Sequence, residues 1–372
     1  MTEPPAEKRV SWAELFFDLV FVFAVTQVSG LLLGDHSGVG LVRAAVVFVP
    51  IYWTWVGTSV QANLRDMTQL QNRSAVFAVA LGGLLMALAV PFAYGDRGVL
   101  FGAAYFAARI VLGLVARSGS GWSLSPFTVA MFVSGPLLLV GGFLPPAVRT
   151  VMWAVAALID LSTPTVLKRR LSTLHFEPGH LSERFGLFVL IAIGETVVAI
   201  GAPAAPAASA AQLSTAALLA VAVAFLVAVG LWWVYFYFAA DAIRFAMETA
   251  QVQTTVARHV LSYGHLVFIG SIIAVAVGMH EAISHPGAPL AFPVAALLYG
   301  GCAGYLATFG YTRWMMFHLV STTRLTAAGV VLVLLPLTVL LPALLSLTVL
   351  AAVLGMLNLI ELRRVRRSAA AQ

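Results

Sequence analysis

The chain has 372 residues, of which 61% are hydrophobic and only 10% are charged, and its mean hydropathy is +0.96. These values exclude an ordinary water-soluble domain and predict an all-α polytopic membrane protein. The formal net charge is +6, but the basic residues lie in short loops and near the C-terminus, so they indicate membrane topology and not nucleic-acid binding.

Apolar stretches of roughly the length that crosses a bilayer, about 17–25 residues, recur along the whole chain. Twelve such stretches lie at residues 13–33, 41–61, 75–94, 99–116, 126–142, 147–166, 183–202, 212–240, 260–280, 291–309, 325–341 and 343–361. We therefore expect about 12 transmembrane helices. Several stretches are near the lower length limit, so ten or eleven spans with a re-entrant segment remain an alternative.

The basic residues divide unevenly between the two sides that twelve alternating spans define. With the N-terminus inside, the inner segments hold Lys8, Arg9, Arg65, Arg73, Arg117, Lys168, Arg169, Arg170, Arg244, Arg258, Arg313, Arg324, Arg363, Arg364, Arg366 and Arg367. The outer loops hold only Arg97 and Arg149, with Arg43 at an outer helix end. This positive-inside pattern favours an even number of spans with both termini in the cytoplasm.

Two helices six spans apart resemble each other in sequence. W-T-W-V-G-T-S-V-Q-A-N at 53–63 aligns with L-W-W-V-Y-F-Y-F-A-A-D at 231–241. The spacing predicts two parallel six-helix repeats related by an axis along the membrane normal, although apolar helices also resemble one another by chance. We expect a first half at 1–170, a cytoplasmic connecting loop at 171–182, a second half at 183–362 and a basic cytoplasmic tail at 363–372.

The first apolar stretch contains two carboxylates, Glu14 and Asp18, in the sequence E-L-F-F-D-L-V-F-V-F-A. Each costs about 3 kcal/mol or more inside hydrocarbon, so it is a candidate functional group. The two lie one turn apart on one helix face, where both do not ionise cheaply without a basic partner. Asp18 therefore fits proton exchange or cation binding, or a structural pair with an arginine. Glu14 fits the same roles or a simple helix N-terminal carboxylate.

Arg109 lies near the middle of the fourth predicted span, with no other charged residue in its own helix. It must find an acid or carbonyl groups across the bundle, and Asp18, Asp160 and Glu195 are the candidate acids. Glu195 lies about three turns into the seventh predicted span and is the strongest candidate for a transport or catalytic carboxylate. The preceding Gly194 would allow another helix to approach closely.

Two further positions leave alternatives open. His265, in the ninth predicted span, suits a proton relay because its reference pKa is close to physiological pH, but a single helical histidine also fits a hydrogen-bonded packing role. Glu183 and Arg184 begin the seventh span and are interpreted as a capped helix start at the cytoplasmic edge.

The chain lacks the motifs of several function classes. It has no Walker sequence, dinucleotide fingerprint, nucleophile elbow or paired metal-ligand set, and its single cysteine, Cys302, supports neither an internal disulfide nor a thiolate cluster. We therefore expect no cofactor and no bound metal. The expected partners are the lipid bilayer, anionic headgroups at the cytoplasmic face, and a small solute or ion.

The chain contains two long and unusual motifs, W-A-E-L-F-F-D-L-V-F-V-F-A-V-T-Q at 12–27 and H-L-S-E-R-F-G-L-F-V-L-I-A-I-G-E-T-V-V-A-I-G at 180–201. Both motifs resemble the bacterial low temperature requirement protein A (LtrA) family. A-A-Y-F-A-A-R at 103–109 extends the resemblance through most of the chain. It implies a multi-pass protein of the bacterial plasma membrane linked to growth in the cold, and specifies no chemical activity.

Three function classes remain after these exclusions. We expect a proton-coupled secondary transporter of a small solute or ion, with Glu14, Asp18, Arg109, Asp160, Glu195 and His265 as candidate coupling or substrate residues. The alternatives are a cation or proton channel and an intramembrane enzyme acting on a lipid or isoprenoid. The sequence favours a non-enzymatic role, and leaves the oligomeric state open.

Overall fold

The computed structural model describes residues 8–117, 123–204 and 214–370. Helix accounts for 85% of the structure, and no strand occurs in these ranges. Nine helices in the described residues are long and apolar enough to cross a membrane. The predicted all-α, multi-span membrane protein is therefore confirmed.

The nine candidate spans are continuous or nearly continuous helices. They are α1 (Trp12–Gly34), α2 (Gly38–Leu64), α3 with η1 (Leu70–Phe92), α4 (Gly98–Arg117), α9 (Pro178–Ala204), α10 (Thr215–Phe236) with α11 (Ala240–Thr249), α12 to α13 (Gln253–Ser284), α14 to α15 (Phe292–Phe317) and α17 (Ala343–Ala370). Three predicted spans correspond to shorter or less apolar helices: α5 to α6 (Pro126–Gly142), α7 (Pro146–Val166) and α16 (Thr322–Thr338).

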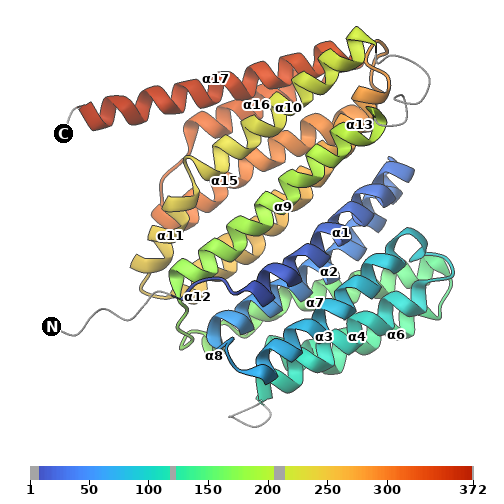
Figure 1. Ribbon diagram of the computed structural model, residues 1–372, viewed down its shortest axis with the longest axis vertical. Coiled ribbons are helices and arrows are strands. Elements are labelled where there is room, and N and C mark those ends of the chain that lie inside the picture. The colour runs from blue at the N-terminus through green and yellow to red at the C-terminus, as the bar shows by residue number, and fades with distance from the viewer. Residues whose placement is uncertain (1–7, 118–122, 205–213, 371–372) are drawn as a thin grey trace. The chain divides into compact units, whose positions relative to one another are not determined.

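The helices group into two compact units, and the division falls inside α9. The first unit comprises Met1–Phe188 and Met247–Ser262, and the second comprises Val189–Ala246 and Tyr263–Gln372. In the first unit, α4 packs between α3 and α6, while α1 packs against α2 and α3, and α2 also contacts α7 (Figure 1). In the second unit, α17 packs along α10, and α15 lies against α13 and α16.

Local sequence explains where α1 begins and how the end of α2 is closed. Ser11 and Glu14 form a capping box, in which the Ser11 amide donates to Glu14 Oε2 at 2.9 Å and the Ser11 hydroxyl accepts from the Glu14 amide. The Lys8 ammonium donates to the carbonyls of Ala62, Asn63 and Arg65 at 2.6, 2.8 and 2.6 Å, and so satisfies the C-terminus of α2. Burial lowers the pKa of this amine.

Close helix approach occurs at glycines other than the one expected. A Cβ at Gly102 on α4 would overlap the backbone carbonyl of Leu138 on α6, and one at Gly278 on α13 would lie 2.6 Å from the Leu298 Cβ. Among the described residues, nothing lies within 4 Å of a Cβ built at Gly194. The expected close approach at Gly194 is therefore wrong, and small residues act at α4 and α13 instead.

Candidate functional site

A buried ionic cluster joins α1, α2 and the first turns of α9 within the first unit. Arg184 Nη1 donates to Asp18 Oδ2 at 3.1 Å. Its Nη2 lies 3.1 Å from Asp18 Oδ1 and donates to the Ser59 hydroxyl at 3.1 Å. The indole of Trp55 donates to Asp18 Oδ1 at 2.8 Å and stacks on Phe188 with ring centroids 4.2 Å apart. The Arg184 and Asp18 side chains are only 0% and 4% exposed, so the pair is shielded from solvent.

The second half of this cluster is built on Glu14 and His180. Glu14 Oε1 lies 3.1 Å from His180 Nε2 and 3.8 Å from Arg184 Nε. The Asn63 amide contacts both backbone groups of Glu177, donating to its carbonyl at 3.0 Å and accepting from its amide at 3.1 Å, and this fixes the amide orientation. Asn63 Nδ2 therefore donates to His180 Nδ1 at 3.0 Å, which places the histidine proton on Nε2, facing Glu14.

This hydrogen-bond pattern has a consequence for the charge of the cluster. Besides the imidazole of His180, the buried ionisable groups of the cluster are two carboxylates and one guanidinium, so the carboxylates outnumber the guanidinium. The half-buried Lys8 ammonium attracts Glu14 from outside the span but is bound to the α2 carbonyls. Because an uncompensated buried charge is costly, the cluster is a place where one proton can be bound.

A second buried ion pair connects α4 to α7. Arg109 Nη2 lies 3.2 Å from Asp160 Oδ2, both side chains are 2% exposed, and the Tyr105 hydroxyl donates to the same oxygen. The guanidinium also lies over the Tyr105 ring, 4.7 Å from its centroid. Of the three acids that the sequence offers to Arg109, the structure places Asp160 as its partner.

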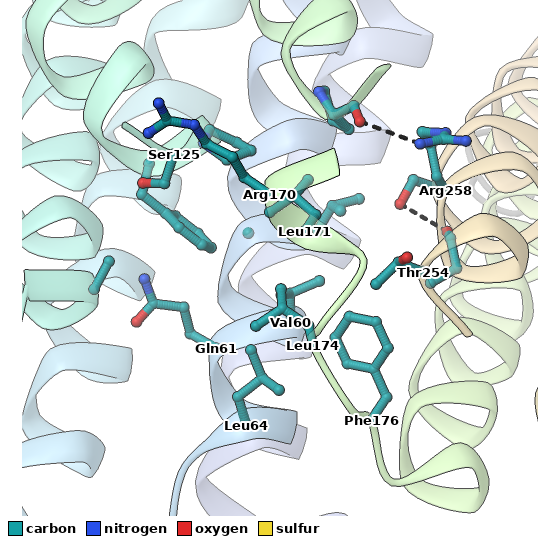
Figure 2. Close-up of a pocket in the computed structure, with 18 of the residues that line it drawn as sticks. Val60, Gln61, Leu64, Ser125, Arg170, Leu171, Leu174, Phe176, Thr254 and Arg258 are labelled. Atoms are coloured by element: carbon teal, nitrogen blue, oxygen red, sulfur yellow. Dashed lines mark hydrogen bonds between the residues drawn. The ribbon is translucent and has the colours of Figure 1, made fainter. Parts of the chain in front are cut away.

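The first unit also contains a pocket of about 620 Å³ at the helix ends predicted to face the cytoplasm. It is surrounded by the C-terminal ends of α2, α4 and α7 and by the start of α5. The short helices α8 (Lys168–Leu171) and η4 (Ala257–Gly264) complete its wall. Arg109 lines this pocket, whereas Asp160 does not. Figure 2 shows Arg170 and Arg258 on opposite sides of the pocket, with Val60, Leu64 and Phe176 below them.

The remaining predicted residues lie in the second unit. Glu195, on α9, is 5% exposed, and His265, at the start of α13, is fully buried. His265 Nε2 lies 2.7 Å from the Tyr235 hydroxyl, and its ring packs edge-on against Phe268. The structure therefore brings Glu14 together with Asp18, and Arg109 together with Asp160, within the first unit. Within the described residues, no group of three histidine, cysteine or acidic side chains is arranged to hold a metal ion.

Sequence reasoning missed the roles of Arg184 and His180. The interpretation of Glu183 and Arg184 as a simple capped helix start is wrong, because α9 begins earlier, at Pro178, and Arg184 is fully buried. The signal was the spacing of His180 and Arg184, which stand one helical turn apart, as Glu14 and Asp18 do. Two basic groups and two acids at the same interval on two helices can pair in register.

Apolar helices that enclose buried ion pairs and an arginine-lined pocket define a polytopic helical membrane protein with charged groups in its interior. The model of the bacterial low temperature requirement A protein (LtrA) family matches residues 9–359, and the chain belongs to this family. It is 34% identical over 329 residues to an uncharacterised protein of Rhizobium meliloti (strain 1021), a match that covers 83% of this chain and 77% of that protein. No solved structure matches the chain significantly.

Proposed function

We propose that this LtrA-family protein is a proton-coupled secondary transporter of a small solute or ion in the bacterial plasma membrane, with both termini in the cytoplasm. The solute binds in the pocket of the first unit. Asp160 and the Glu14–Asp18 cluster carry the coupling proton.

The observation that carries the proposal is the position of Arg109. Its guanidinium lines the pocket and at the same time pairs with Asp160, which lies outside the pocket lining. A proton on Asp160 removes the charge that holds Arg109, so the guanidinium becomes available to a solute. Conversely, a solute that engages Arg109 favours protonation of Asp160. Reciprocal effects of this kind are what coupled transport requires.

The cluster around Arg184 supports the same function by a different route. It ties α1 and α2 to α9, and it can bind one proton for the charge reason given above. Loss or gain of that proton changes the attraction between α1 and α9 by the interaction of a full charge at about 3 Å. This change in the electrostatic attraction between α1 and α9 can favour one arrangement of the helices over another, as alternating access requires.

Proton flux into liposomes that contain the purified protein tests the proposal. An imposed pH gradient and a panel of anionic, neutral and cationic solutes are compared for the wild type, Asp160→Asn and Asp18→Asn. Glu183→Gln, an exposed acid next to Arg184, is the matched control and should behave as wild type. We expect solute-dependent proton flux that Asp160→Asn abolishes. Solute-independent proton conductance would instead indicate a channel, and the absence of flux in folded protein would point to a membrane enzyme.

A further inference from the structure

The pocket of the first unit has an uneven charge. Four arginines contribute to its lining, Arg65, Arg109, Arg170 and Arg258, and no aspartate or glutamate is among the described residues that line it. Like charges in one partly enclosed space repel one another, and this repulsion is strong where water is excluded. An anionic ligand would remove it.

Two other buried arginines of this chain are held mainly by acceptors within the fold. Arg324 donates to both oxygens of Glu361 at 2.9 Å. Arg149 donates to the carbonyls of Ala93, Gly95 and Gly142 at 2.6, 2.8 and 3.0 Å. Arg324 is structural, because acceptors within the fold meet its donors, whereas Arg149 is held by three carbonyls and only its Nε is buried without a partner among the described residues.

Three of the four pocket arginines, Arg109, Arg170 and Arg258, keep donors that the fold does not fully satisfy. Arg258 Nη1 donates to the Pro164 carbonyl at 3.3 Å, and its other contacts are to the ring of His259. The exposed Arg170 side chain has no hydrogen bond or ion pair with another described residue, and in Figure 2 it extends toward Ser125. Arg109 Nε is buried without a hydrogen-bond partner among the described residues, although Nη2 pairs with Asp160. Guanidinium donors of Arg109, Arg170 and Arg258 thus remain available within the pocket.

The rest of the lining defines a second property of the ligand. Apolar side chains form the larger part of the wall, among them Val60, Leu64, Leu174 and Phe176. The volume of about 620 Å³ is in the ordinary range for a small organic ligand. Arginines beside an apolar wall fit a molecule with an oxyanion at one end and an apolar body.

We propose that this pocket binds an amphipathic organic anion, whose phosphate or carboxylate is held by Arg170 and Arg258 and faces Arg109, and whose apolar part lies against Val60, Leu64 and Phe176. This inference names the solute class of the proposed transporter and rests on that function for its physiological meaning. The same chemistry is presented by a soluble alkyl phosphate and by the headgroup region of an anionic lipid, so the test must separate the two sources.

The test is equilibrium binding to the full-length protein in uncharged detergent micelles, with hexyl phosphate as the soluble probe. Hexyltrimethylammonium serves as the cationic counterpart of equal chain length, and mixed micelles containing dioleoyl phosphatidic acid or dioleoyl phosphatidylcholine form the lipid arm. We expect hexyl phosphate to bind saturably and the ammonium probe not to bind. Arg258→Gln and Arg170→Gln should each weaken binding about tenfold, equivalent to about 1.4 kcal/mol.

Arg169→Gln is the matched control, because Arg169 is an exposed arginine on the same short helix but does not line the pocket. It should leave binding unchanged. Equal effects of Arg169→Gln and Arg170→Gln, equal binding of the cationic probe, or failure of both anionic probes would overturn the inference. Displacement of hexyl phosphate by phosphatidic acid but not by phosphatidylcholine would assign the anion to a lipid, and its absence would assign it to a soluble molecule.

Binding and flux can fail separately. If anion binding depends on Arg170 but the protein shows no solute-dependent proton flux, the proposed binding site stands and the proposed transport function is refuted. If neutral or cationic solutes drive proton flux and no anion binds, the proposed transport function stands and the proposed anionic solute class is refuted.

Discussion

Replacement of Arg184 by Met should be among the most damaging single changes in the first unit. Arg184 is the guanidinium shared by Asp18 at 3.1 Å and Glu14 at 3.8 Å, and its side chain is fully buried. Its loss leaves two carboxylates that no buried arginine compensates, and breaking a buried ion pair from one side costs about 3–5 kcal/mol. At about 2–4 °C per kcal/mol for a domain of this size, the midpoint of thermal unfolding should fall by about 10 °C.

The structure also predicts an asymmetry between the two partners. Asp18→Asn removes one carboxylate but leaves Arg184 with Glu14 and Ser59, so it should cost only about 2 kcal/mol. The double variant should lose clearly less than the sum of the two single losses, because the partner that each single change strands is then absent. Thermal unfolding of the purified protein in detergent, with Arg169→Met as the exposed control, measures all of these values. Additive losses in the double variant, or an Arg184→Met variant as stable as the control, would refute the reasoning.

Four further changes test separate parts of the protein. Trp55→Phe keeps an aromatic ring against Phe188 but removes the donor to Asp18, and we expect a loss of about 1.5–3 kcal/mol in the same unfolding measurement. Gly102→Ala should prevent accumulation of folded protein, because the added Cβ meets the α6 backbone. Gly194→Ala should instead stabilise the fold by up to about 1 kcal/mol through helix propensity. Gel filtration of the expressed proteins compares the amounts of folded protein for the two variants. Tyr105→Phe removes a donor to Asp160 and should therefore change the rate of solute-driven proton flux, and an unchanged rate would contradict the coupling role of Asp160.

The membrane class and nine of the twelve predicted spans follow from composition and hydropathy, because lipid imposes long apolar helices on any chain that crosses it. The predicted spans at 126–142, 147–166 and 325–341 are not among the candidate spans in the described residues, so the total of twelve is not confirmed. The partner of each buried charged residue, in contrast, does not follow from the local sequence. The sequence indicated that Arg109 needs an acid or carbonyl groups as its partner, and it offered three acids. Only the packing of α4 against its neighbours selects Asp160. The two parallel six-helix repeats and the cytoplasmic placement of both termini stay predictions.

Arg184 illustrates why the candidate site was only half predictable. A basic residue close to a helix start usually signals an interface with water, and nothing local distinguishes an arginine that turns inward. Its burial depends on α1 presenting Asp18 at the same level, which is a property of two helices far apart in sequence. The pocket could not be predicted from the sequence for the same reason, since its arginines come from four separate segments.

The central claim is that groups of the first unit move a solute together with a proton. The most direct test records internal pH and uptake of labelled hexyl phosphate in the same proteoliposomes, with the membrane potential clamped at zero. We predict that an inward proton gradient drives hexyl phosphate uptake, that acidification requires the solute, and that Asp160→Asn abolishes both signals. Acidification at the same rate with and without solute, or uptake indifferent to the gradient, would contradict the account.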